Sequence, residues 1–382
     1  MSEPKGRGLG KSRRVVVKLG SMVLTGGNGT LDRNLFLWLA EDVRELRAAG
    51  MEVAIVSSGA VAAGLDRLGL TARPASIPEV QAVAAVGQIN LMMAYKEVFG
   101  AEELMVGQVL LTRDDLENRR RYQNAKNTLQ TLFRMDVVPV INENDTVVVE
   151  EIKFGDNDNL SAMVTNLIEA DCLIIFTDTE GLYDRDPKIY PDANLIHRVD
   201  TVDETVEAFV GQSQTAVGTG GMGTKLLAAK RAAHGGAGVV IASGRHPHAL
   251  RRILADEQLG TYFPPMEDRL TRRKHWIAYT VQPLGELELD QGAVRALRDK
   301  GRSLLPKGIH AVRGAFDRGD AVRLLAPDGS EVGRGLTNYS AEEVRKIAGL
   351  ASWEIADRLG YRFYDEVVHR DDLVVVVAPD NS

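Results

Sequence analysis

The sequence is poor in the features that would place it in a membrane, in an oxidising compartment or on nucleic acid. It has one cysteine in 382 residues, so no disulfide can form within the chain. No stretch reaches the ~18 to 20 uninterrupted apolar residues that a membrane helix needs. Positive charge is not in excess, because 46 Lys and Arg stand against 53 Asp and Glu, a net of −7. We therefore expect no membrane partner, and the charge balance argues against nucleic acid as a partner.

The lone Cys172 and the first residues both indicate a cytoplasmic protein. Cys172 lies in the apolar run DCLIIF, where a buried, inert thiol is expected. The first 14 residues are partly basic but lead into a short VVVKLG segment rather than an apolar signal core. Few cysteines and no secretion signal are typical of the cytoplasm, which is the expected location.

What the sequence does contain is an alternation of strand-like and helix-like segments. Apolar, β-branched runs predict strands, and periodic apolar positions predict helices between them. The alternation predicts an α/β fold with an open, mostly parallel sheet between layers of helices. Strands are expected at 14–20, 52–58, 104–111, 136–142, 171–178 and 238–243, and helices at 31–50, 76–99 and 117–135.

The pattern of apolar and polar residues changes near residue 260. A Pro-Pro pair and the basic run RLTRRKHW predict a linker over 263–283. Short strands and turn glycines come next, and the Asp328-Gly329 pair between alternating apolar residues predicts a hairpin. We expect a first domain at 1–262 and a small β-rich domain with a C-terminal tail at 284–382.

Polar residues stand at the ends of four of the predicted strands. In an open parallel sheet, ligands bind beyond the carboxyl ends of the strands, so these residues are candidates for a site. One such strand end would be ordinary, because turns favour Gly, Ser, Asn and Asp. Four of them favour a functional site: Lys18 to Ser21, Ser57 to Ala60, Asn142 to Asp145, and Thr177 with Asp178.

A glycine cluster at 218–225, GTGGMGTK, precedes a helical run. It fits G-x-G-x-x-G literally, but no strand stands directly before it, so the dinucleotide fingerprint is weak. It is not a Walker A loop, because Thr224-Lys225 come after Gly223. Backbone N–H groups at the start of a helix, with a lysine in its first turn, favour an anion. An ordinary glycine-rich loop is the alternative.

The segment 142–158, NENDTVVVEEIKFGDND, is dense in carboxylates and amides. It lacks the calcium-loop pattern, so a metal site is one interpretation and a solvated loop is the other. In the second interpretation, Asp156 or Asn157 caps the next helix. The seven histidines show no zinc spacing and no G-x-S-x-G elbow is present, so no metal ligand is assigned.

Together these motifs resemble the amino acid kinase family. The segments VVVKLGS, IVSSGAVAAG, VPVINENDTV, EIKFGDNDNLSA, FTDTEGLYDRDP and GTGGMGTK occur in this order, and NEND with GDNDN resembles the glutamate-phosphorylating branch. The C-terminal part, from GELELDQGAVRAL to YSAEEVRKIAG, is similar to a PUA domain. Gly223 stands where some relatives have serine, and Ser57 replaces a threonine common there.

The resemblance implies phosphorylation of the side-chain carboxylate of L-glutamate by ATP with Mg²⁺, the first step of proline biosynthesis. A carboxylate is a nucleophile at pH 7, so no general base is needed, and two lysines would stabilise the transferring group. The implied catalytic residues are Lys18, Lys225 and Asp158, and the implied glutamate site is Ser58, Gly59, Ala60, Asp145 and Asn157. The implied ATP site is Lys18, Gly20, Thr177, Asp178, Thr219, Gly220, Gly221, Met222, Gly223, Thr224 and Lys225.

The resemblance also implies partners: proline as an inhibitor that competes with glutamate through the segment 145–158, a homotetramer or homodimer, and glutamyl phosphate reductase. Three alternatives stay open. One is an RNA-binding protein, although residues 285–382 carry 14 Lys and Arg against 17 Asp and Glu. The others are an NAD-dependent oxidoreductase and a family member that phosphorylates another acid, such as carbamate or acetylglutamate.

Overall fold

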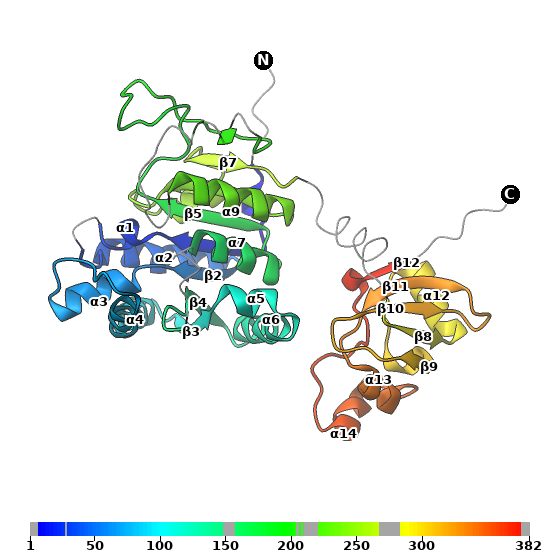
Figure 1. Ribbon diagram of the computed structural model, residues 1–382. Helices are drawn as coiled ribbons and strands as arrows, with labels where there is room; N and C mark the ends of the chain where they lie inside the picture. The colour runs from blue at the N-terminus through cyan, green and yellow to red at the C-terminus, as the bar shows by residue number, and fades with distance from the viewer. Residues whose placement is uncertain are drawn as a thin grey trace, which may run out of the picture. The chain divides into compact units, whose positions relative to one another are not determined.

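The computed structural model describes residues 7–26, 29–147, 157–203, 206, 207, 209, 221–266 and 283–375 (Figure 1). The chain forms two compact units, Met1–Met266 and Glu267–Ser382, which are described separately. Within the described residues, no helix is long and apolar enough to cross a membrane.

The first unit is built on a seven-stranded sheet in the order β3-β4-β2-β1-β5-β6-β7. Strands β1 to β6 pair in parallel, and β7 pairs antiparallel with β6 at one edge. This confirms the predicted open, mostly parallel sheet. The strands are β1 Arg14–Leu19, β2 Glu52–Ser57, β3 Met105–Leu111, β4 Val137–Glu143, β5 Cys172–Thr177, β6 Gly238–Ser243 and β7 Thr261–Phe263.

Helices cover both faces of this sheet, which is why its central strands are apolar throughout. Alternate residues of one strand enter different cores: Val15 and Val17 pack in one cluster, and Val16 packs in the other. The first cluster includes residues of α2 Arg33–Ala48, α4 Ile77–Ala101 and α10 Ala249–Leu254. The second includes residues of α5 Arg113–Glu117, α6 Arg119–Arg134, α7 Asn157–Leu167 and α9 Met222–His234.

Two short helices begin just after strand ends in this unit. Helix α1, Ser21–Leu24, comes after β1, and α3, Ala60–Leu68, comes after β2. Helices α3 and α4 cross with their backbones in contact. A Cβ added to Gly87 would lie 1.8 Å from the Ala60 carbonyl oxygen, and one added to Gly64 would lie 2.0 Å from that of Val83. Only glycine permits this approach.

The predicted helix 117–135 is wrong at its first residues, because two helices meet there. Asn118 has extended backbone angles, φ −79° and ψ 117°, and its side chain accepts a hydrogen bond from Arg121 N. It ends α5 and caps α6, which an apolar pattern does not reveal. The predicted helix 31–50 appears as α2, capped by Asp32, and Gly50 just beyond it has φ +85°.

The second unit has a five-stranded sheet in the order β12-β11-β10-β8-β9 and a core of its own. Its strands are β8 Gly285–Leu289, β9 Ile309–Gly314, β10 Ala321–Leu325, β11 Glu331–Leu336 and β12 Leu373–Val375; its helices are α12 Gln291–Lys300, α13 Ala341–Ile347 and α14 Ile355–Leu359. Strands β10 and β11 form the predicted hairpin, with Gly329 at φ +84°. Short 3₁₀ helices occupy Leu9–Lys11, Pro306–Gly308, Ser352–Glu354 and Arg370–Asp372.

The predicted limits of the two domains stay a prediction. Residues 267–282 of the predicted linker 263–283 lie outside the described residues, as does the end of the tail, 376–382. Phe263, placed in the linker, belongs to β7. A three-residue edge strand carries too few residues for a pattern to predict it.

Candidate active site

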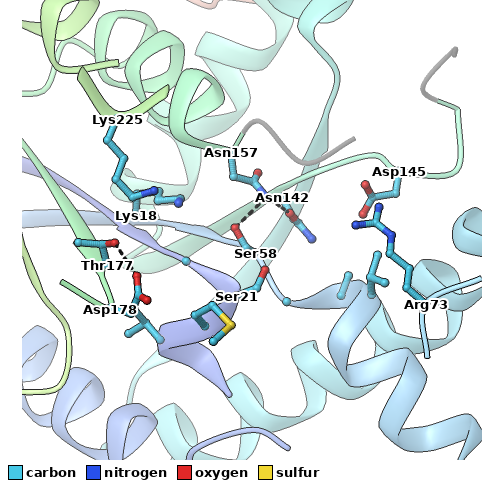
Figure 2. Close-up of a pocket in the computed structure, with 16 residues that line it drawn as sticks. Lys18, Ser21, Ser58, Arg73, Asn142, Asp145, Asn157, Thr177, Asp178 and Lys225 are labelled. Carbon is cyan, nitrogen blue, oxygen red and sulfur yellow. Dashed lines mark hydrogen bonds between the residues drawn. The ribbon is translucent and has the colours of Figure 1, made fainter. Parts of the chain in front are cut away.

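A cavity of about 360 Å³ lies where β1, β2, β4 and β5 end (Figure 2). Neighbouring parallel strands present their carboxyl ends at one edge of the sheet, so residues far apart in sequence meet here. The lining residues are Lys18, Gly20, Ser21, Met22, Val23, Ser58, Gly59, Ala60, Val61, Arg73, Asn142, Asp145, Asn157, Thr177, Asp178 and Lys225.

Two lysines and one aspartate form an ion-pair group at this cavity. Lys18 Nζ lies 2.5 Å from Asp158 Oδ1, and Lys225 Nζ lies 3.2 Å from Asp158 Oδ2. Thr224 donates a hydrogen bond of 2.6 Å to Asp158 Oδ2. All three charged side chains are buried: Lys18 is 4% exposed, Lys225 5% and Asp158 1%. The structure thus brings together the three residues for which a catalytic role was predicted.

This burial sets the protonation of the group. Burial alone would raise the pKa of Asp158, but the charges of Lys18 and Lys225 outweigh it and hold that pKa at about 2. Burial lowers the pKa of Lys225, and the Asp158 carboxylate opposes that shift. The Asp178 carboxylate also favours the charged form of Lys225. The low pKa keeps Asp158 ionised, so one carboxylate pairs with the side chains of both lysines beside the cavity.

Gly20 and Gly59 shape the backbone next to these side chains. A Cβ at Gly20 would meet the Phe176 carbonyl oxygen at 3.4 Å and Lys18 Nζ at 3.7 Å, so glycine leaves room beside the ammonium group. Gly59 has φ +96° and precedes the first residue of α3, Ala60. This left-handed turn joins the end of β2 to a helix whose N-terminus lies at the cavity, where free N–H groups favour an anion.

Three polar side chains form a connected set in the middle of the cavity wall. Asn157 Nδ2 donates to Ser58 Oγ and to Asn142 Oδ1, each at 3.1 Å (Figure 2). All three residues are buried, with 9% or less of their surface exposed. They come from β4, from the turn after β2 and from the first residue of α7. Ser58 and Asn157 were predicted to bind the substrate together, and the structure places them in direct contact.

Asp145 lies apart from the lysines, beside the guanidinium of Arg73 (Figure 2). Burial raises the pKa of Asp145 to about 6, and the Arg73 charge opposes that rise. Arg73 stands between α3 and α4, on a segment that comes after no strand. The sequence reasoning missed it for that reason. A basic residue just before a proline in a loop is its only local signal.

Thr177 and Asp178 stand at the end of β5 and line the cavity near Lys225. Thr177 Oγ1 donates to Asp178 Oδ1 at 3.2 Å. Of the predicted glycine-rich segment, Thr219 and Gly220 lie outside the described residues. Gly221 precedes α9, and Met222, Gly223 and Thr224 form its first turn with Lys225. Of these five residues only Lys225 lines the cavity.

The described residues offer no metal site made by the protein. Within them, no group of three or more His, Cys, Asp or Glu side chains is placed to hold a metal ion. Asp158 is paired with two lysines, and Asp156, one of the two predicted helix caps, lies outside the described residues. A magnesium ion here would depend on ligands from a bound nucleotide.

A polar cavity at the carboxyl edge of a parallel sheet, with two buried lysines paired to one carboxylate, suits the binding of an anionic group such as a phosphate. The sequence matches the amino acid kinase family over residues 13–243 and the PUA domain over residues 285–359. The chain belongs to the amino acid kinase family, as its motifs predicted, and its second unit contains a PUA domain.

Curated relatives are similar over nearly the full chain. The protein named glutamate 5-kinase from Geobacter sp. (strain M21) is 56% identical over 96% of this chain and 99% of its own length. The protein of that name from Citrifermentans bemidjiense is 55% identical over the same shares. Among solved structures, UMP kinase from Bacillus anthracis aligns with 67% of this chain and 97% of its own, at 17% identity and a TM-score of 0.45. The sequence relatives, not that alignment, inform the function.

Proposed function

We propose that this protein transfers the γ-phosphoryl group of ATP to the side-chain carboxylate of L-glutamate, giving L-glutamyl 5-phosphate and ADP. This is the first step of proline biosynthesis. The observation that carries the proposal is the similarity along almost the whole chain to proteins named glutamate 5-kinase, at 55% to 56% identity. The chemistry of the cavity supports it, because an acyl phosphate forms without a general base.

Lys18 and Lys225 are proposed to flank the transferring phosphoryl group. The attacking carboxylate and the phosphates repel each other, so the main task is to neutralise charge and hold the two substrates in line. Two ammonium groups shielded from water are strong partners for that charge. Asp158 is proposed to position both lysines, since each contacts a different oxygen of its carboxylate.

The amino-acid end of glutamate is proposed to bind at the other side of the cavity. The Asp145 carboxylate suits an α-ammonium group, and Asn157 adds an amide oxygen. The Ser58 hydroxyl and the backbone N–H groups of Gly59 and Ala60 suit a carboxylate. These five residues would orient the substrate so that its side-chain carboxylate faces the lysines.

ATP is proposed to bind along β5 and α9. The proposed contacts are Lys18, Gly20, Thr177, Asp178 and the segment Thr219, Gly220, Gly221, Met222, Gly223, Thr224 and Lys225. The N–H groups at the start of α9 would receive phosphate oxygens. Magnesium would be held mainly by the nucleotide rather than by side chains of the protein, and it would neutralise part of the phosphate charge.

The family resemblance supports further proposals. Proline is proposed to compete with glutamate through the segment 145–158, of which 148–156 lies outside the described residues. A homotetramer or homodimer, a cytoplasmic location and transfer of the product to glutamyl phosphate reductase are proposed on the same ground.

The test is ADP release from ATP and Mg²⁺ with L-glutamate, with hydroxylamine present to trap an acyl phosphate. D-glutamate, aspartate, acetylglutamate, and bicarbonate with ammonia serve as comparison substrates. We expect ADP release and hydroxamate only with L-glutamate, and suppression of both by proline. Activity with another acid alone would keep the reaction type and change the substrate. Activity with none would overturn the proposal.

A further inference from the structure

The orientation of one buried side-chain amide in the cavity wall is fixed by the backbone. The N–H of Glu143 donates to Asn142 Oδ1 at 2.9 Å. A backbone N–H can only donate, so the Asn142 atom that faces it must be the oxygen. The amide nitrogen of Asn142 therefore points the other way, toward α4.

This fixed amide determines the donors and acceptors of the neighbouring groups. Asn142 Nδ2 donates to Gln88 Oε1 at 2.8 Å, and Gln88 belongs to α4. On the other side, Asn142 Oδ1 accepts from Asn157 Nδ2, which also donates to Ser58 Oγ. Both amide hydrogens of Asn157 are thus used, and Ser58, which accepts, keeps its own proton to donate.

One acceptor in this set has no partner. Asn157 Oδ1 is buried and accepts no hydrogen bond from any residue that the structure describes. Asn157 lines the cavity. A buried oxygen without a donor is unfavourable, and a ligand that supplies an N–H removes that cost. The set therefore offers an incoming molecule one acceptor, Asn157 Oδ1, and one donor, the Ser58 hydroxyl.

We propose that Gln88 is a positioning residue for amino-acid recognition: its Oε1 anchors Asn142, which orients Asn157 so that Asn157 Oδ1 receives the α-ammonium group of the substrate. The proposal rests on the proposed function, since it assigns the acceptor to the ammonium of glutamate. Gln88 itself does not line the cavity.

The position of Gln88 is set by the helix crossing rather than by its own contacts. Gly87, its neighbour, lies so close to α3 that an added Cβ would stand 1.8 Å from the Ala60 carbonyl oxygen. The backbone of α4 therefore cannot move closer to α3 at this turn. Without an acceptor at residue 88, the buried Asn142 Nδ2 loses its partner. The Asn142 amide is then held on one side only, by the Glu143 N–H, and the position of Asn157 beside it is less well defined.

The test compares the KM for L-glutamate with the inhibition constant of glutarate, which has the same two carboxylates and no ammonium. Gln88→Met has nearly the same shape and no acceptor oxygen, and Gln88→Glu keeps an acceptor at the same place. Gln123→Met is the matched control, because Gln123 lies on α6, away from the cavity, and donates to Asn127. Thermal unfolding verifies that each variant is folded.

We expect Gln88→Met to raise the KM for glutamate about tenfold and to change glutarate inhibition less than about twofold, because only glutamate has the ammonium group. Gln88→Glu should keep the ratio of the two constants within about threefold of the unaltered enzyme, and Gln123→Met should leave it unchanged. The proposal is wrong if Gln88→Met raises the KM for glutamate and the inhibition constant of glutarate by the same factor. It is also wrong if the ratio of these two constants changes as much in Gln88→Glu as in Gln88→Met. If Gln88→Met does not fold, loss of the ratio in Gln88→Glu still refutes the proposal.

The activity of the unaltered enzyme distinguishes a failure of the proposed function from a failure of the role proposed for Gln88. If it releases no ADP with glutamate, the proposed function fails. If it is active with glutamate and the Gln88 variants leave the ratio unchanged, only the role of Gln88 fails.

Discussion

Lys18 and Lys225, which lie 207 positions apart in the sequence, contact opposite oxygens of the single Asp158 carboxylate, at 2.5 and 3.2 Å. Two ammonium groups would repel each other if they were buried together without a counter-ion. The carboxylate removes much of that repulsion while leaving the group with one net positive charge. Asp158 thus allows two lysine side chains to lie buried beside one another at the cavity.

Lys18→Ala and Lys225→Ala should each lower kcat by at least about 100-fold and change the KM for glutamate little, because the lysines act on the transferring group. Steady-state kinetics of ADP release measure both constants. Lys230→Ala is the matched control on α9, since the Lys230 side chain is 41% exposed, pairs with Glu207 and does not line the cavity. A variant of Lys18 or Lys225 that folds and retains normal turnover would refute the assigned roles.

Asp158→Asn should be less stable than the unaltered protein by about 3 to 5 kcal/mol, because it leaves two buried ammonium groups without their counter-ion. Urea denaturation at pH 7 measures the free energy of unfolding. ATP should restore part of the loss, since its phosphates supply negative charge to the folded state only. Equal stability of the variant and the parent would contradict the role of Asp158 in holding the lysines.

The same carboxylate makes stability depend on pH. The pKa of Asp158 is about 2 in the folded protein, below its ordinary value of 3.8. The stabilisation is therefore present above pH 3.8 and is lost as the pH falls from there toward 2. The free energy of unfolding should decline over this range in the parent and decline less in Asp158→Asn. If the free energies of unfolding of the parent and of Asp158→Asn decline equally with falling pH, Asp158 is not the source of the pH dependence.

Acid should weaken glutamate binding through Asp145. Burial raises the pKa of Asp145 to about 6, so its carboxylate gains a proton as the pH falls through that value. A neutral side chain attracts an ammonium group less, so the KM for glutamate should rise below about pH 6. Asp145→Asn should have a high KM at every pH. A KM that stays level in the parent between pH 7 and 5 would exclude this role.

Arg73→Leu should raise the pH below which the KM for glutamate increases, because the Arg73 charge opposes the rise in the pKa of Asp145. The KM for glutamate, measured from pH 5 to 8, should begin to rise at a higher pH than in the parent. Arg67→Leu, an exposed change on α3 away from the cavity, should reproduce the parent profile. If the two variants have the same profile, Arg73 does not act on Asp145.

Gly87→Ala should destabilise the protein and raise the KM for glutamate, because the new methyl group would lie 1.8 Å from the Ala60 carbonyl oxygen and push α3 away. Overpacking of this kind costs about 1 to 3 kcal/mol or more. Gly100→Ala, on the same helix, has no atom within 4 Å of the added carbon and should be neutral or stabilising. Similar melting temperatures for the two variants would contradict the close crossing.

The sequence predicted the parts of the site that stand at strand ends. Lys18, Ser58, Asn142 and Thr177 each lie at or just after an apolar run, so the rule for parallel sheets places them at one edge. It could not predict Arg73 and Gln88. Arg73 lies in a connection between two helices, and Gln88 lies inside a helix whose pattern indicates only that it is helical. Their proximity to the site results from the α3–α4 packing, a tertiary contact that no local pattern contains.

The sequence did not predict the order of the strands in the sheet either. Apolar runs such as VVVKLG predict buried strands, but they do not say that β1 lies between β2 and β5. The pairing of β1 with both neighbours is what brings Lys18 between Ser58 and Thr177. The motifs resembling a known family supplied the site residues where physical patterns alone left alternatives.

The second unit encloses a hydrophobic core made only of its own residues, between Leu287 and Leu373. Among the residues that the structure describes, no apolar side chain of the first unit belongs to that cluster, and helices of the first unit cover both faces of its own sheet. Each unit therefore has, within the described residues, the apolar contacts that a domain needs in order to fold by itself.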